Sequence, residues 1–135
     1  MKDGAKAWIV FADRDLEAAK GLLENEYVAN IVLFHCQQCI EKSLKAILEE
    51  HGEQVPKIHS VVRLYRIINE TAEGIEIRID EDELNIVDDI YIDMRYPSGL
   101  GLLPSGFPTK EVATEVLEIA KRIYDKVFLY LNRDE

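Results

Sequence analysis

The chain has 135 residues, 47% of them hydrophobic, so it can form one folded domain over residues 1–135 without a disulfide or metal. Its 26 acidic and 16 basic residues give a formal net charge of −10, which disfavours a general binder of nucleic acid or of an anionic membrane. A local basic site or a basic protein partner is still compatible with this charge. The N-terminus has no apolar signal core, and no apolar run approaches the roughly 20 residues of a membrane span. We therefore expect a cytoplasmic protein.

Residues 4–24 have the periodicity of an amphipathic helix. Its apolar face consists of residues at alternating steps of three and four: Ile9, Ala12, Leu16, Ala19 and Leu23. The connection at residues 25–26 is short, which favours an antiparallel packing of this helix against the next one.

The longest predicted helix covers residues 29–50, a segment without Gly or Pro. Its apolar stripe, which we expect to face the core, consists of Leu33, Cys36, Ile40, Leu44 and Ile47. A second line at helical spacing is polar after its first member: Phe34, Gln38, Glu41 and Lys45. Gly52 is typical of the position just beyond a helix end. If this helix carries a function, we expect it on the polar line.

A third helix is predicted to begin after Ser60, which is a suitable N-cap residue. Its apolar residues continue to about residue 72, and Gly74 ends it. Residues 76–79 alternate like a strand, but a run this short without a partner favours an extended link.

A fourth helix is predicted from Asp80 to about Met94, because Asp80 and Glu83 have the spacing of a capping box. Residues 97–108 are rich in Gly and Pro and are predicted to form a loop long enough to suggest a role. Thr109 is the predicted N-cap of a last helix that extends through Leu131.

Two groups of potential metal ligands favour a structural interpretation. Cys36 and Cys39 follow His35, but a closed zinc site needs a second pair of ligands, and a redox pair uses a helix N-terminus. We expect both cysteines to be small core residues of a protein in a reducing compartment. We expect no metal and no cofactor.

An acidic group on the fourth helix, made of Asp88, Asp89 and Asp93, lacks the Gly-patterned loop of a calcium site. We therefore expect these residues to form a solvated acidic helix face.

Two polar groups are candidates for ligand binding. Glu41 and Lys45 have the favourable i, i+4 order of a surface ion pair, and Gln38 adds an amide one turn earlier. From composition alone, a solvated helix face is the favoured interpretation. Arg95, at a helix end beside the Gly-rich loop, offers a forked cation near free backbone amides, which suits a phosphate. The alternative is an ion pair of Arg95 with a nearby acid.

In combination, these segments resemble the HEPN family, the higher-eukaryote and prokaryote nucleotide-binding domain. The matching residues are Trp8, Ala12, Asp15, Leu16, Ala19, Leu22 and Leu23 in the first helix, Gln38, Glu41, Lys42, Leu44, Lys45 and Ala46 in the second, His59-Ser60, and Tyr91 with Arg95-Tyr96-Pro97. The resemblance implies an all-α, up-and-down bundle of four or five helices that is commonly a homodimer. It also implies one candidate ligand-binding surface, made of Gln38, Glu41, Lys45, Tyr91, Arg95 and Tyr96.

The resemblance also bears on activity, since some HEPN proteins are metal-independent ribonucleases. Their motif is an Arg followed after about four to six residues by a His, which together stabilise phosphate charge and move protons. In this chain the corresponding window holds Leu100, Gly101 and Leu102, and all three histidines precede Arg95. The motif is therefore absent unless His59, or a residue of another chain, enters the site.

The resulting hypothesis is a noncatalytic homodimer that binds a nucleotide or presents one to a minimal nucleotidyltransferase, a partner that the family resemblance implies. In this hypothesis Arg95 and Lys45 hold phosphate, and Gln38 and Tyr96 orient the base or sugar. One alternative is a ribonuclease toxin with a rearranged site. The other is a pure protein-interaction module without a ligand.

Overall fold

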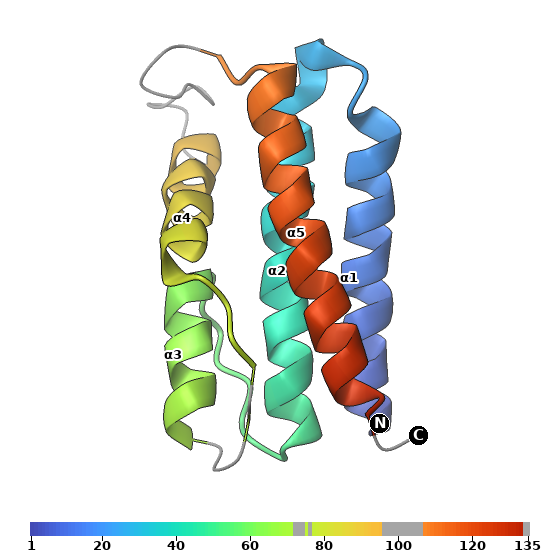
Figure 1. The fold of residues 1–135 in the computed structure, drawn as a ribbon, viewed down its shortest axis with the longest axis vertical. Coiled ribbons are helices and arrows are strands. Elements are labelled where there is room, and N and C mark those ends of the chain that lie inside the picture. Colours follow the sequence, from blue (N-terminus) through green and yellow to red (C-terminus); the bar gives the residue numbers. More distant parts are fainter. Residues whose placement is uncertain (72–74, 76, 96–106, 134–135) are drawn as a thin grey trace.

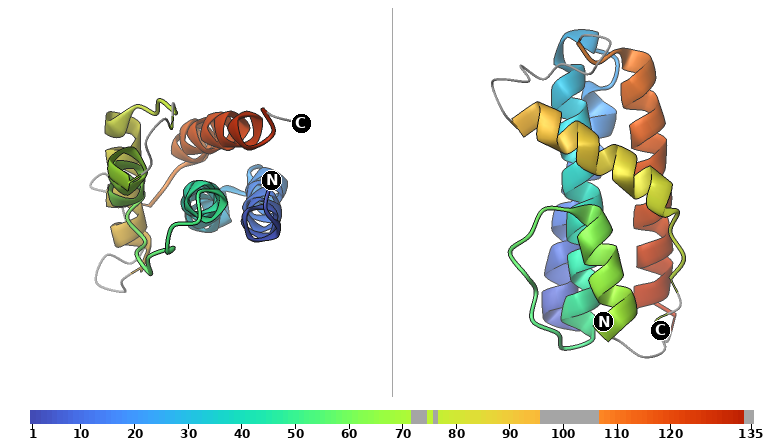
Figure 2. Two further views of the ribbon diagram at one scale, coloured as in Figure 1. Left: turned by 90° about the horizontal axis from the view of Figure 1, so that it is seen from below. Right: turned by 90° about the vertical axis from the view of Figure 1, so that its left-hand side faces the viewer.

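The protein is an all-helical bundle, seen in a computed structural model that describes residues 1–71, 75, 77–95 and 107–133, with residues 92–95 described by their backbone alone. In this part of the chain the helices are α1 (Asp3–Leu22), α2 (Ala29–Glu50), α3 (Val61–Thr71), α4 (Glu81–Arg95) and α5 (Lys110–Leu131), with the 3₁₀ helix η1 (Glu26–Val28) before α2. The long helices α1, α2 and α5 stand side by side, and α3 and α4 form a second layer along α2 (Figure 1). Viewed from that layer, α4 crosses the bundle obliquely (Figure 2). No helix in the described residues is long and apolar enough to cross a membrane.

The predicted helix boundaries agree closely with the structure, because the signals that set them are local. The hydroxyl of Thr109 accepts a bond from the Val112 amide at 3.2 Å. The hydroxyl of Ser60 accepts one from the Arg63 amide at 3.1 Å. Beyond α2, Gly52 has a φ of 73°, a left-handed conformation that residues with a Cβ rarely adopt.

Two expectations about acidic residues are wrong. The first is the capping box at the start of α4. Asp80 does cap this helix, with its carboxylate 2.9 Å from the Asp82 amide. Glu83 does not complete the box, because its carboxylate binds Arg122 of α5 at 2.7 and 2.9 Å.

The second wrong expectation concerns Asp88, which is not part of a solvated acidic face. Its carboxylate accepts bonds from the Ser60 hydroxyl at 2.7 Å and from the amides of Val61 at 2.8 Å and Val62 at 3.3 Å. Asp88 therefore caps α3 from α4 and joins these two helices. Asp89 is exposed, and the side chain of Asp93 lies outside the described residues. Within the described residues no group of at least three His, Cys, Asp or Glu side chains could hold a metal ion.

The centre of the core is α2, which packs against each of the other described α-helices. The predicted stripe from Leu33 to Ile47 is buried throughout. On the predicted apolar face of the first helix, Ile9, Ala12, Leu16 and Ala19 are buried, and Leu23, just beyond α1, is partly buried. Cys36 and Cys39 are buried free thiols, which confirms their predicted place in the core. Burial raises the pKa of Cys36 to about 12 and raises the pKa of Cys39 as well, so both thiols stay protonated and apolar near neutral pH.

Candidate functional site

Glu41, near the middle of α2, is the centre of a group of polar side chains. This residue is only 4% exposed. One carboxylate oxygen accepts a bond from the Lys45 ammonium at 3.0 Å, and the other lies 3.2 Å from Gln37 Nε2 and 3.1 Å from His59 Nδ1. With Gln38, whose amide nitrogen donates to the Gln37 side-chain oxygen at 2.6 Å, these residues form what we call the Glu41 cluster.

Gln37 connects α2 to the loop that carries His59. It is 1% exposed, and its amide nitrogen donates to the backbone carbonyl of His59 at 2.8 Å as well as to Glu41. Sequence reasoning missed Gln37, because it lies outside the polar line of the helix. The available signal was its i, i+4 spacing from Glu41, the same spacing that separates Glu41 from Lys45.

The expectation of a solvent-exposed Glu41–Lys45 ion pair is wrong. The side chains are 5% and 7% exposed, and the Lys45 ammonium lies 5.6 Å from the centre of the Trp8 ring. The i, i+4 spacing predicted the pair correctly, but it carries no information about what covers the pair. Because the Lys45 charge is already paired and buried, a phosphate bound by Lys45 would have to compete with Glu41.

The side chain of His59 is 50% exposed, which makes it far more accessible than the side chains of Glu41 and Lys45. A carboxylate can only accept, so in the neutral ring the contact with Glu41 places the proton on Nδ1 and the lone pair on Nε2. The His59 ring lies 5.9 Å from the ring of Tyr91 on α4. The structure thus brings together the predicted residues Gln38, Glu41, Lys45 and Tyr91.

The other predicted site residues lie at the end of α4. Arg95 is the last residue of that helix, and its side chain, like all of Tyr96, lies outside the described residues. Positions 91 and 95 are four residues apart on one helix, so they share a face. Most of the predicted loop at 97–108 is also outside the described residues.

A second group of similar composition lies between α1 and α2, and sequence reasoning missed it. Asp15 is 8% exposed, and its two carboxylate oxygens lie 2.8 Å from His35 Nδ1 and 2.6 Å from the Lys42 ammonium. We call these residues the Asp15 cluster. The Lys42 ammonium also lies 6.0 Å from the centre of the Phe11 ring. Asp15 is 20 residues from His35 and 27 from Lys42 in the sequence, so no local pattern predicts that these three side chains meet.

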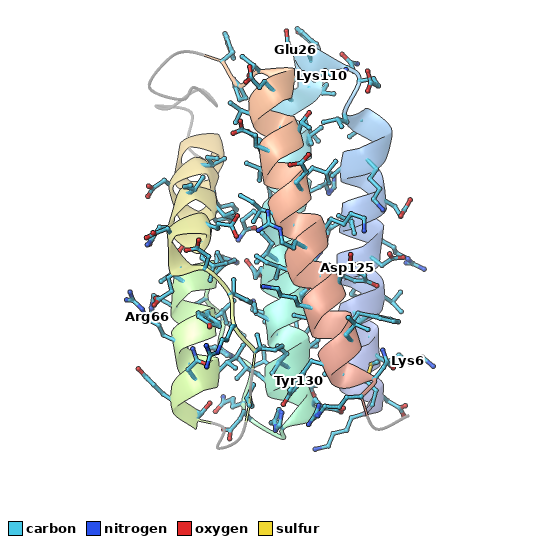
Figure 3. The ribbon with its side chains drawn as sticks, viewed as in Figure 1. Lys6, Glu26, Arg66, Lys110, Asp125 and Tyr130 are labelled. Atoms are coloured by element: carbon cyan, nitrogen blue, oxygen red, sulfur yellow. The ribbon has the colours of Figure 1, made fainter. Side chains whose placement is uncertain are left out.

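The ion pairs of α3, α4 and α5 are more exposed than the Glu41 cluster. Arg66 pairs with Glu81, with side chains 61% and 45% exposed. Lys121 pairs with Asp125, with side chains 54% and 52% exposed. Arg66 points away from the bundle in Figure 3.

Sequence comparison identifies the class of protein to which this all-helical fold belongs. The HEPN domain family matches residues 5–130, so the chain belongs to the HEPN family. This confirms the resemblance and the predicted all-α bundle.

Individual relatives agree with this assignment. The chain is 35% identical over 138 residues to "Putative toxin MJ1304" of Methanocaldococcus jannaschii, with 95% of this chain and 88% of that protein covered. The crystal structure of TT1696 from Thermus thermophilus is similar with a TM-score of 0.78 and 26% identity, covering 96% of this chain and 99% of that one. The crystal structure of ST0689, an archaeal HEPN homologue, has a TM-score of 0.65 and 26% identity, covering 95% and 97%.

Proposed function

We propose that this HEPN protein is a toxin-type ribonuclease in which His59 transfers the proton that the reaction requires. The observation that carries the proposal is the contact between His59 Nδ1 and the buried Glu41 carboxylate at 3.1 Å, on a histidine whose side chain is half exposed. A histidine oriented by a carboxylate is a common arrangement for general acid–base catalysis. The M. jannaschii relative, whose name is "Putative toxin MJ1304", supports this class of function.

Each residue of the site has its own role in the proposed cleavage of RNA. Nε2 of His59 takes the proton of a ribose 2′ hydroxyl, and the 2′ oxygen attacks the adjacent phosphorus. The bond to the 5′ oxygen breaks, and this oxygen takes a proton from solvent, which leaves a 2′,3′-cyclic phosphate and a 5′ hydroxyl. Glu41 stabilises the imidazolium that forms, and Arg95, one turn beyond Tyr91, stabilises the phosphate charge.

Gln37 and Lys45 hold the pair of His59 and Glu41 in place. Gln37 binds both the Glu41 carboxylate and the His59 carbonyl, at 3.2 and 2.8 Å. Lys45 binds the other carboxylate oxygen from a site covered by Trp8. Rigid support of this kind keeps a catalytic group within reach of its substrate.

The test is incubation of the protein with tRNA and structured RNA in the presence of EDTA. We compare His59→Asn with the matched variant His35→Asn, since Asn retains a donor close to the Nδ1 position but cannot transfer the proton. His59→Asn should lower the cleavage rate by about 10²–10⁴-fold, and His35→Asn should leave it within about twofold. Intact RNA with the wild-type protein, or equal loss in both variants, contradicts the proposal.

A second candidate function is the noncatalytic one, a homodimer that presents a nucleotide to a minimal nucleotidyltransferase. The observation that favours it is the window after Arg95, where Leu100, Gly101 and Leu102 cannot transfer a proton. ATP and GTP are titrated while the fluorescence of Trp8, which lies 5.6 Å from the Lys45 ammonium, is followed. A saturable response that Arg95→Ala abolishes, without RNA cleavage, favours this candidate over the ribonuclease. Light scattering gives the oligomeric state.

A further inference from the structure

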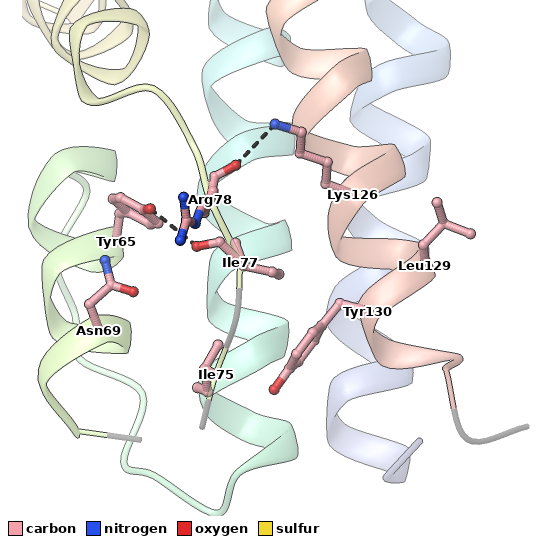
Figure 4. A pocket seen from close by; sticks show the side chains of 8 residues that line it. All are labelled: Tyr65, Asn69, Ile75, Ile77, Arg78, Lys126, Leu129 and Tyr130. Atoms are coloured by element: carbon pink, nitrogen blue, oxygen red, sulfur yellow. Dashed lines mark hydrogen bonds between the residues drawn. The ribbon is translucent and has the colours of Figure 1, made fainter. Parts of the chain in front are cut away.

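A cavity of about 780 Å³ lies outside both clusters, between α3, α5 and the chain before α4 (Figure 4). Its apolar wall includes Ile75, Ile77 and Leu129, and the rings of Tyr65 and Tyr130 also line it. Leu129 is 70% exposed, so its side chain is accessible to a ligand. Volume and lining are within the range of sites for small organic molecules.

The hydroxyl groups of both tyrosines make hydrogen bonds within the protein, which hold the rings in place. The Tyr65 hydroxyl donates to the carbonyl of Ile77 and accepts from the amide of Ile79, both at 3.1 Å. The Tyr130 hydroxyl lies 2.7 Å from His51 Nε2. The guanidinium of Arg133 stacks 4.0 Å from the centre of the Tyr130 ring. Because these rings are already fixed, little conformational entropy is lost when a ligand binds against them.

The described polar lining of the cavity includes two cations, although the whole chain has a net charge of −10. The lining residues among those described include Arg78 and Lys126 and no carboxylate. The Arg78 guanidinium makes no hydrogen bond or ion pair with another described residue, and the Lys126 ammonium binds the backbone carbonyl of Arg78 at 3.0 Å. The other basic residues of α5 all pair with carboxylates: Lys110, Lys121 and Arg122.

We propose that this cavity binds a flat organic anion, with its phosphate or carboxylate at Arg78 and Lys126 and its ring against Tyr65 and Tyr130. Arg78 and Lys126, which pair with no carboxylate of the described residues, supply charge-assisted donors for the anionic group. The fixed rings supply an apolar surface for a planar molecule. Asn69, on the α3 side of the cavity, offers an amide that can both donate to and accept from the edge of that ring. This site is independent of RNA cleavage at His59.

The test is isothermal titration calorimetry of the full chain with adenosine monophosphate, phenyl phosphate and benzoate, with adenosine and inorganic phosphate as partial ligands. At least one flat anion should bind saturably in a 1:1 complex, and each partial ligand should bind at least about tenfold more weakly. Arg78→Gln and Lys126→Gln should each weaken binding by roughly tenfold, because each removes one charge-assisted contact. Lys6→Gln, which removes an exposed charge on α1, should leave binding unchanged.

Two results overturn the proposal. One is the absence of saturable heat with all three flat anions at millimolar concentration. The other is equal weakening by Lys6→Gln and by the two cavity variants, which would indicate a general charge effect. Thermal unfolding of each variant, compared with the wild type, separates loss of the site from loss of the fold. NMR shifts of the Tyr65 and Tyr130 rings locate the ligand.

Discussion

The Glu41 cluster and the Asp15 cluster contain the same kinds of group in two different places along α2. In each, one carboxylate binds a lysine of α2, which is Lys45 for Glu41 and Lys42 for Asp15. In each, the second oxygen of that carboxylate lies within about 3 Å of the Nδ1 atom of a histidine. Because the two clusters contain the same kinds of group, any difference in their properties has to come from their surroundings.

The two clusters differ in which of their groups solvent reaches. In the Glu41 cluster the ion pair is 5% and 7% exposed and His59 is 50% exposed, whereas in the Asp15 cluster the lysine and His35 are 24% and 26% exposed. His59 also contacts Tyr91 of α4, while His35 contacts its own neighbour Phe34. The comparison teaches that a buried ion pair can serve as a rigid support for an accessible histidine.

The largest expected effect on stability comes from removing the two carboxylates. Glu41→Ala leaves the Lys45 charge buried without a partner and should lower the free energy of unfolding by about 3–5 kcal/mol. Asp15→Ala should cost about 1–3 kcal/mol, because Lys42 can be solvated. Urea denaturation at pH 7 measures both. Equal losses would mean that burial does not separate the two clusters.

The next effect concerns the link between α2 and the His59 loop. Gln37→Leu removes the donor to Glu41 and to the His59 carbonyl and should cost about 1–3 kcal/mol. It should also increase amide hydrogen exchange around His59, while exchange around His35 stays unchanged. Faster exchange at both places would indicate general loosening of the fold, and no change at His59 would show that Gln37 does not hold the loop.

A smaller effect concerns the two buried thiols of α2. The pKa of Cys36 rises from 9.0 in its ordinary state to about 12 through burial. Above pH 9 the unfolded state loses this proton while the folded state keeps it, so stability is fully present below pH 9 and falls between pH 9 and about 12. At pH 10 the loss is about 1–2 kcal/mol for this group. Urea denaturation from pH 8 to 10.5 measures it. Cys36→Ala should reduce the slope, while the part due to Cys39 remains; an equal slope in this variant assigns the effect elsewhere.

The smallest effect is expected at Lys121 and Asp125, which have the same i, i+4 spacing as Glu41 and Lys45. Since both side chains are more than half exposed, Lys121→Ala should change the free energy of unfolding by less than about 0.5 kcal/mol. A change as large as that of Glu41→Ala in the same urea experiment would show that spacing, and not burial, sets the strength of these pairs.

The helices and the core stripe of α2 could be predicted from the sequence because periodicity, caps and Gly52 act within a few residues. The site could be predicted only in part. Glu41 and Lys45 form a pair at helical spacing, but their burial depends on Trp8 of another helix and on a loop. His59 reaches Glu41 through a loop that Gln37 binds at the His59 carbonyl, and no pattern along the chain encodes that contact.

The most direct test of the account is chemical rescue of RNA cleavage by imidazole. The account predicts that His59→Ala cleaves RNA at least about a hundredfold more slowly than wild type and that added imidazole restores part of the rate. His35→Ala should cleave at nearly the wild-type rate, with or without imidazole. Wild-type rates in His59→Ala without imidazole, or a loss that imidazole restores in His35→Ala instead, would contradict the assignment of His59 as the proton-transfer group.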